Sequence, residues 1–129
     1  MPVRGIRGAI DVARNAKEEI LDRTGELLDA LIRENRVKAE DVVAAIFSLT
    51  PDLNAEFPAI AARRRGWTEV PLMCCAELDI PGAMKRVVRI LLLVNSARPA
   101  SAVRHQYLGN TPRLRPDLAA KGAKKGGRR

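Results

Sequence analysis

The sequence is poor in aromatic residues, cysteine and histidine, and each shortage excludes a class of protein. Only 3% of the 129 residues are aromatic, so the core has to be aliphatic and base stacking on aromatic rings is disfavoured. Two adjacent cysteines, Cys74 and Cys75, cannot build a disulfide framework, which indicates a reducing compartment. We interpret them as small strand residues rather than as a nucleophile with His105. Because His105 is the single histidine, a histidine-rich metal site is excluded.

Long apolar runs and common catalytic motifs are also missing. The longest apolar run, residues 90–94, has the length of a strand and is far short of the roughly 20 residues that cross a bilayer. The first residues lack the apolar region of a signal peptide, so we expect a cytoplasmic protein without membrane attachment. Motifs of serine hydrolases, zinc proteases, P-loop proteins and dinucleotide-binding folds are absent.

Positive charge is plentiful, but much of it lies in the last residues. The formal net charge is +8, and segment 121–129 contributes five basic residues and no acidic one. We therefore expect one folded domain over residues 1–118 and a basic, disordered tail over residues 119–129. The tail leaves nucleic-acid binding open as an alternative, although a solubilising terminus is the more common role.

Hydrophobic periodicity predicts an α/β domain, with a mixed sheet of about five strands and two main helices on one face. Strands are expected at residues 3–9, 42–49, 70–75 and 85–95, and helices at 15–34 and 57–65. Residues 103–108 are expected to form a last short strand or a turn of helix. The apolar segment 42–49 indicates a strand buried on both faces, with a helix as the alternative. Asn15 and Glu18 match a capping box for the first helix, which Asn35 would end. Segment 111–118 contains two prolines and is expected to be extended.

Of the arginines within predicted strands, Arg7 and Arg89 point to function, because a charge inside a strand is costly unless it has a partner. Arg89 is followed by five apolar residues, so we favour a functional role over a side chain that reaches solvent. Arg7 lies beside glycines, which permit close approach of a ligand, although a plain surface arginine fits equally well. The chain also offers a wider set of arginines, and with Glu77 and Tyr107 this set suits a small dianion, since guanidinium groups bind carboxylates through two hydrogen bonds. The set comprises Arg7, Arg63, Arg89, Arg104, Arg113 and Arg115. Such a set suits a reaction in which charge only redistributes.

A series of short motifs runs in order through residues 3–118. They are Arg4-Gly5-Ile6-Arg7-Gly8-Ala9, Thr50-Pro51-Asp52-Leu53, Phe57-Pro58-Ala59, Gly66-Trp67, Val70-Pro71, residues 74–79, Arg104-His105 with Tyr107-Leu108, and Leu114-Arg115-Pro116-Asp117-Leu118. The set resembles the monofunctional chorismate mutase of the Bacillus type, the trimeric α/β form. The resemblance implies an isomerase that converts chorismate to prephenate in phenylalanine and tyrosine biosynthesis, without cofactor or metal. It also implies a homotrimer with a barrel-like core and an active site in each cleft between subunits.

The resemblance assigns roles to the residues that match the family's motifs. Arg89 matches the cation at the ether oxygen and the enolpyruvyl carboxylate, and Arg7 matches the arginine that holds a substrate carboxylate. Glu77 matches the carboxylate that accepts the ring hydroxyl, and Cys74 matches a cysteine near that hydroxyl. Tyr107 matches the phenol that donates to the side-chain carboxylate.

Further residues match the walls of the family's site. Phe57 and Ala59 match an apolar wall, and Arg63 matches a cation near the mouth, all supplied by the neighbouring subunit. Leu114 and Arg115 match the C-terminal segment that closes over the ligand.

Two positions depart from the family's pattern. Ile60 stands where a lysine is frequent, so one peripheral cation is missing. Met73 replaces a small polar residue beside the ring, where a backbone contact would survive. We expect these changes to affect substrate affinity more than the chemical step. The alternatives to an enzyme are a catalytically silent trimer that binds a carboxylate metabolite and a nucleic-acid-binding protein that acts through its tail.

Overall fold

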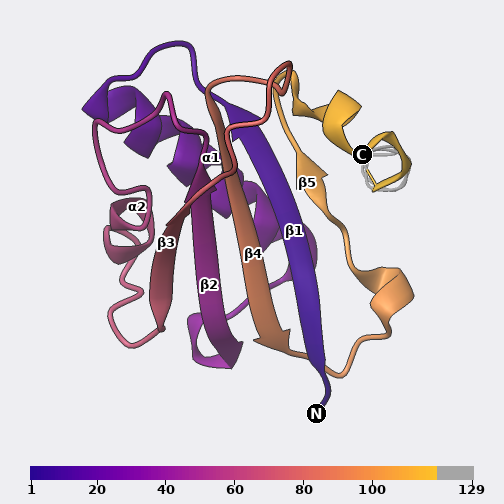
Figure 1. Ribbon diagram of the computed structural model, residues 1–129. Coiled ribbons are helices and arrows are strands. Elements are labelled where there is room, and N and C mark those ends of the chain that lie inside the picture. Colours follow the sequence, from indigo (N-terminus) through magenta and orange to yellow (C-terminus); the bar gives the residue numbers. More distant parts are fainter. Residues whose placement is uncertain (119–129) are drawn as a thin grey trace.

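The computed structural model describes residues 1–118, so the predicted tail, 119–129, lies outside the described residues. A five-stranded mixed sheet forms the body of the domain, with the strand order β3-β2-β4-β1-β5 (Figure 1). Its strands are β1 (Val3–Asp11), β2 (Val42–Leu49), β3 (Leu72–Ala76), β4 (Val87–Asn95) and β5 (Gln106–Tyr107). The central strand β4 is antiparallel to β1 and β2, whereas the outer strands β3 and β5 run parallel to their neighbours. The prediction of a mixed five-stranded sheet is confirmed.

One long helix, α1 (Lys17–Asn35), covers one face of the sheet (Figure 1). The second main helix expected over residues 57–65 is wrong, because α2 (Ile60–Arg63) is a single turn that packs against α1. The backbone bonds at its start, from Ala61 N to Pro58 O and from Ala62 N to Ala59 O, span three residues each. The bonds from Arg63 N to Ala59 O and from Arg64 N to Ile60 O span four residues, and the bonds made by Arg65 and Gly66 span three again. The α-helical spacing therefore lasts for a single turn between two 3₁₀ turns.

The start of α1 differs from the predicted capping box. Ala16 is the N-cap residue, and its methyl side chain makes no capping hydrogen bond. The Asn15 side chain instead accepts hydrogen bonds from the backbone N–H groups of Asn54 and Ala55, both at 3.0 Å. The Asn15 side chain was expected to accept a hydrogen bond from the first turn of α1, but it bonds to the distant loop at residues 54–55 instead.

The end of α1 also lies one residue later than predicted. Arg36 takes the left-handed conformation that was expected of Asn35, with φ of 52°. Asn35 remains helical because its buried side-chain amide bonds to the Leu31 carbonyl at 3.0 Å and to the Arg104 carbonyl at 2.9 Å. This amide links the helix to the segment that leads into β5.

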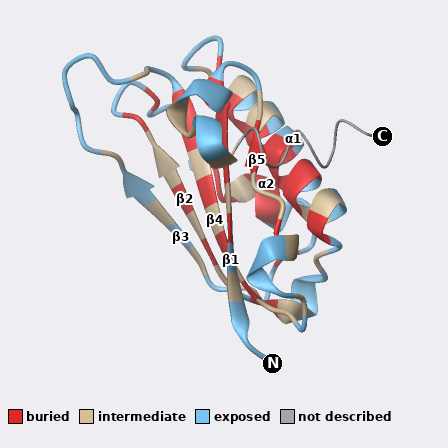
Figure 2. Cartoon of the chain, turned by 90° about the vertical axis from the view of Figure 1, so that its right-hand side faces the viewer, coloured by how far each residue is buried: buried red, intermediate tan, exposed pale blue. Residues whose placement is uncertain are grey.

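The face of the sheet under α1 is a continuous aliphatic core. Its fully or almost fully buried members include Ile6, Ile10, Phe47, Val88, Ile90 and Leu92 from the strands, and Ile20, Leu27, Leu28 and Leu31 from α1. Buried residues concentrate where α1 meets the sheet (Figure 2). Burying side chains of this size stabilises a fold by roughly 1.5–3 kcal/mol each, so this face supplies most of the stability.

The opposite face, here called the open face, is uncovered along most of its length. Ile46 and Leu91 on this face are half-buried, and Met73 is exposed. The expectation that β2 is buried on both faces is therefore wrong for residues 1–118 of a single chain, in which no layer covers β2 on this side. Near β5 the open face is covered by a small cluster in which Tyr107 packs with Ala9.

The C-terminal segment is wound rather than extended, contrary to the prediction. Residues Thr111–Leu114 form a 3₁₀ helix. The Thr111 hydroxyl donates to the Leu108 carbonyl at 2.7 Å and reaches the Ala9 carbonyl at 3.0 Å, which folds the chain back over the end of β1. Leu114 consequently packs against the cluster around Tyr107.

Candidate active site

The open face holds a cavity of about 370 Å³ over its central strands. Its lining comprises Arg7, Gly8, Ile46, Ser48, Arg89, Ile90, Leu91 and Tyr107. The strand register accounts for this convergence. Ser48 and Ala9 lie directly opposite Arg89 on either side of β4, and Tyr107 lies opposite Ala9 on the next strand. Residues far apart in the sequence therefore form one row across the sheet.

Arg89 is paired with Glu77, which follows the end of β3. The Nε of Arg89 donates to both carboxylate oxygens of Glu77 at 3.1 Å. The backbone N–H of Glu77 donates to the Leu49 carbonyl at 2.9 Å, which holds the residue beside β2. The Arg89 and Glu77 side chains are 37% and 16% exposed, so the pair remains accessible to a ligand.

Arg7 and Tyr107 reach the same cavity from β1 and β5. The backbone N–H of Arg7 donates to His105 Nδ1 at 3.0 Å, just before β5 pairs with β1. The cavity thus receives two guanidinium groups, one of them already balanced by Glu77, and one phenol. Such a set can bind a ligand with two carboxylates and a hydroxyl group.

Other predicted site residues lie on the side of the sheet that α1 covers. Cys74 pairs with Phe47 across β2 and β3, so its side chain points away from the face that carries Arg89. Burial raises the pKa of the Cys74 thiol, which favours a neutral thiol over a nucleophilic thiolate. Ala59 is buried, and Arg63 lines a separate cavity of about 280 Å³. Within one chain, the structure does not bring these residues to the Arg89 cavity.

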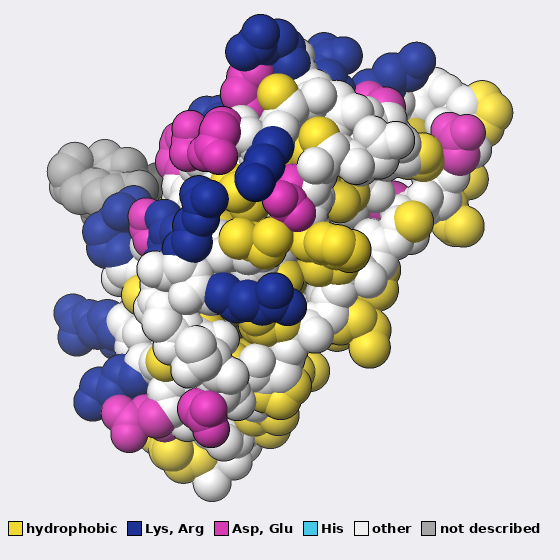
Figure 3. Space-filling model, turned by 90° about the vertical axis from the view of Figure 1, so that its left-hand side faces the viewer, with side chains coloured by type: hydrophobic (Ala, Val, Ile, Leu, Met, Phe, Trp, Pro, Cys, Tyr) yellow, Lys and Arg dark blue, Asp and Glu magenta, His cyan; other side chains and the backbone are white. Residues whose placement is uncertain are grey.

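Phe57 and Met73 are unusually exposed for large apolar residues, at 66% and 60%. Met73 belongs to the open face, because it lies opposite Ile46 across β2 and β3. In the view onto the β3 edge (Figure 3), hydrophobic side chains are grouped in the middle, around a basic side chain, and along the right-hand side, whereas most charged side chains lie at the top and on the left. This edge offers apolar surface that the single chain leaves uncovered.

Leu114 and Arg115 follow the turn after β5. Leu114 packs against the cluster around Tyr107, so the structure brings it close to the Arg89 cavity. Arg115 pairs with Asp117, with its terminal nitrogen 2.9 Å from the carboxylate, and this hydrogen bond raises the pKa of Arg115. The guanidinium is therefore held within the C-terminal segment itself.

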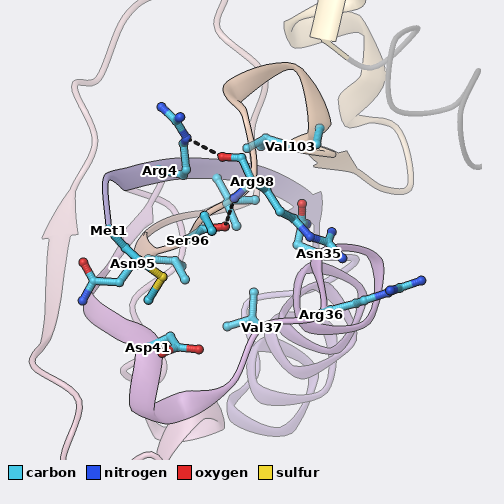
Figure 4. A pocket seen from close by; sticks show the side chains of 14 residues that line it. Met1, Arg4, Asn35, Arg36, Val37, Asp41, Asn95, Ser96, Arg98 and Val103 are labelled. Carbon is cyan, nitrogen blue, oxygen red and sulfur yellow. Dashed lines mark hydrogen bonds between the residues drawn. The ribbon is translucent and has the colours of Figure 1, made fainter.

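Another cavity, of about 230 Å³, lies where β1 begins and β4 ends. Three arginines line it, but they do not converge (Figure 4). Arg4 donates from Nε to the carbonyl of Arg98 at 2.9 Å, and the Arg4 and Arg36 side chains point away from the space. The arginines that line this cavity therefore do not place two guanidinium groups where one dianionic ligand could bind both.

Comparison with known proteins decides the family. The family model for chorismate mutase type I matches residues 3–118. The chain belongs to the chorismate mutase type I family. It is 47% identical over 120 residues to chorismate mutase AroH of Bacillus subtilis (strain 168), covering 92% of this chain and 94% of that protein.

Other members of the family match as well. Chorismate mutase AroH of Thermus thermophilus is 46% identical over 117 residues, which cover 90% of this chain and 96% of that protein. The structure of a chorismate mutase from Clostridium thermocellum superimposes with a TM-score of 0.84 at 39% identity, covering 85% of this chain and 98% of that one.

This chorismate mutase has a polar cavity residue that sequence reasoning missed, Ser48. The hydroxyl of Ser48 donates to Glu77 Oε2 at 2.6 Å. The sequence could have indicated this residue, because Ser48 is the single polar residue of the apolar segment 42–49. Among residues 1–118, no group of three or more His, Cys, Asp or Glu side chains could hold a metal ion. No helix in the same part of the chain is long and apolar enough to cross a membrane.

Proposed function

We propose that this enzyme rearranges chorismate to prephenate in the cavity on the open face of the sheet. The observation that supports this site is the convergence of Arg7, Arg89 and Tyr107 on one cavity, with Glu77 paired to Arg89. Chorismate carries two carboxylates, an ether oxygen and a ring hydroxyl. Two guanidinium groups, a phenol and a carboxylate complement these groups one by one.

The reaction is a [3,3] rearrangement, in which one C–O bond breaks and one C–C bond forms within the same molecule. The ether oxygen gains negative charge as its bond lengthens, and Arg89 stabilises that charge more strongly in the transition state than in the ground state. Arg7 and Tyr107 hold the carboxylates so that the two reacting ends meet. Glu77 accepts a hydrogen bond from the ring hydroxyl. No nucleophile and no proton transfer by the enzyme are needed.

We also propose that residues 1–118 form one domain that assembles as a homotrimer in the cytoplasm, with each active site completed by a neighbouring subunit. The support is the separation of the predicted site residues within one chain into two groups. The open-face group comprises Arg7, Arg89 and Tyr107 in the cavity, with Glu77 paired to Arg89. The edge group comprises Cys74 with its neighbours Ala59 and Arg63, together with the exposed Phe57. The exposure of Phe57 and Met73 supports a subunit that packs against this edge.

The oligomeric state is tested by the mass of the protein in solution, measured by light scattering during size-exclusion chromatography. We expect three chains per particle. Subunits that carry Arg89→Ala can then be refolded together with subunits that carry Arg63→Ala, which affects the other group. A mixture more active than the average of its two parents supports shared sites, and a monomeric active enzyme would contradict them.

Activity is tested by loss of the ultraviolet absorbance of chorismate, in buffer that contains EDTA, with the wild type and Arg89→Ala side by side. Removing one donor to a developing oxyanion typically costs about 10²–10³ in rate, and we expect at least that loss. Arg89→Lys should also lose much of the rate, because a point charge does not reproduce the guanidinium fork. A folded Arg89→Ala variant with the wild-type rate would remove Arg89 from the site, and a folded wild type without turnover would remove the function.

A further inference from the structure

Ser48 occupies a particular place between the two members of the ion pair in the active site. Glu77 belongs to the segment after β3, whereas Arg89 lies on β4, so β2 separates them. Ser48 on β2 lies directly opposite Arg89 on one side and directly opposite Cys75 on the other. Neighbouring strands are about 4.8 Å apart, so the Glu77 side chain has to cross β2 to reach its partner. Ser48 marks the point of crossing.

We propose that Ser48 is a positioning residue that fixes the Glu77 carboxylate, and through it the Arg89 guanidinium, for the rearrangement. The proposal rests on the proposed function. The contact that carries it is the 2.6 Å hydrogen bond from the Ser48 hydroxyl to Glu77 Oε2. Hydrogen bonds to a carboxylate are short and strong compared with those between neutral groups.

The need for a second donor follows from what Arg89 has to do. In the structure, the Nε of Arg89 holds both oxygens of Glu77. A bound dianion competes for the same guanidinium. Ser48 carries no charge and gives its hydroxyl hydrogen to Glu77 alone, so its hold on the carboxylate persists when Arg89 engages the ligand. Without the Ser48 hydroxyl, the Glu77 carboxylate would be held only by the Arg89 guanidinium, for which the substrate competes.

The test compares Ser48→Thr with Ser48→Val, which have the same shape and differ in the hydroxyl. Both are β-branched and suit a strand. Because a hydrogen bond to a charged group is strong, we expect its loss in Ser48→Val to lower kcat roughly 10- to 100-fold. Ser48→Thr keeps the hydroxyl, so its kcat should lie within about threefold of wild type. The matched control is Ser96→Val, outside the Arg89 cavity, whose hydroxyl accepts the Arg98 N–H at 3.1 Å; its kcat should match that of wild type.

A double-mutant cycle separates positioning from direct contact with the substrate. In a Glu77→Ala background, Ser48→Val should change kcat by less than about twofold, because the group that Ser48 holds is gone. A full additional loss there would show that Ser48 acts on the ligand itself and would overturn the proposal. So would a rise in KM with kcat unchanged, or equal rates for the threonine and valine variants.

The experiments also distinguish a failure of the role proposed for Ser48 from a failure of the proposed function. Unfolding by urea, followed without chorismate, should show the same non-additivity between Ser48→Val and Glu77→Ala, since the hydrogen bond exists in the free enzyme. A folded wild type without turnover overturns the function and, with it, this role. A wild type that turns over chorismate, with Ser48→Val equally fast, overturns the role of Ser48 alone.

Discussion

The two faces of the sheet are made by the same strands and serve different purposes. On β4, Val88 is fully buried beneath α1, whereas the next residue, Arg89, faces the cavity. On β2, Phe47 and Ser48 are divided in the same way. Because successive side chains of a strand point to opposite faces, one residue can stabilise the core while the next residue lines the cavity. The comparison teaches that charged groups can lie on the central strands of a sheet without entering its core.

The largest difference between the faces is expected for truncations on β2. Phe47 is fully buried beneath α1, and Phe47→Ala should lower the free energy of unfolding by about 3–5 kcal/mol, through lost burial and the cavity left behind. Ile46→Ala, on the open face, should cost less. Urea unfolding of both variants measures the difference. Equal losses would mean that the open face is packed as tightly as the core.

Glycines on β1 sharpen the same comparison. A Cβ atom at Gly8 would lie 2.8 Å from the backbone oxygen of Gln106 and 2.9 Å from the Leu27 side chain. Gly8→Ala must therefore push β5 away, and we expect it to cost about 1–3 kcal/mol and to lower kcat/KM by moving Tyr107.

The matched control for that glycine lies on the open face. A Cβ atom at Gly5 would meet nothing closer than 3.7 Å, which is an ordinary contact. Gly5→Ala should change stability by less than about 0.5 kcal/mol. Urea unfolding and chorismate assays on both variants measure these effects, and a Gly5→Ala loss as large as that of Gly8→Ala would contradict the close approach inferred for Gly8.

Apart from the Gly5 control, the smallest effect concerns the turn that follows β5. The Asp11 carboxylate accepts hydrogen bonds from the backbone and side-chain nitrogens of Asn110, both at 2.9 Å. Burial alone would raise the pKa of Asp11, but these hydrogen bonds and the charge of Arg23 outweigh it and hold the pKa below its ordinary value of 3.8. A lowered folded-state pKa means that the stabilisation is complete above the unfolded pKa and is lost as the pH falls through the folded one.

Asp11→Asn should therefore cost about 1 kcal/mol near neutral pH, and the difference from wild type should shrink as the pH falls below about 4. Urea unfolding measured between pH 7 and pH 2.5 checks this. A difference that stays constant across that range would show that the charge of Asp11 is not what holds the turn.

Most of the sheet could be predicted because its strands carry local signals. The apolar run that begins after Arg89 predicts a strand by composition, and the 3.6-residue pattern predicts α1. Segment 42–49 favours a strand, but its two alanines left a helix open as the alternative. The helix ends could not be predicted, because Asn15 can bond either to its own helix or to a distant loop, and only the tertiary fold selects Asn54. Likewise, the apolar composition of β2 does not say whether a second layer covers its open face, and within residues 1–118 only the face under α1 is covered.

The candidate site divides in a similar way. Arg89 was detectable because a charge inside an apolar strand is costly without a partner. Ser48 was not, because a serine near the end of a strand is common and its partner Glu77 lies 29 residues away in sequence. The placement of Cys74 on the covered face depends on the β2–β3 register, which the sequence pattern did not specify.

One measurement tests the division of labour between the faces most directly. It combines chorismate consumption and urea unfolding for two variants on β4, Arg89→Met and Leu92→Ala, of which Leu92 is fully buried beneath α1. Arg89→Met should lose about 10²–10³ or more in rate while unfolding near the wild-type urea midpoint. Leu92→Ala should lose about 2–5 kcal/mol of stability while its folded fraction keeps a kcat near that of wild type. An active Arg89→Met variant, or one that loses activity only because it unfolds, would contradict the account.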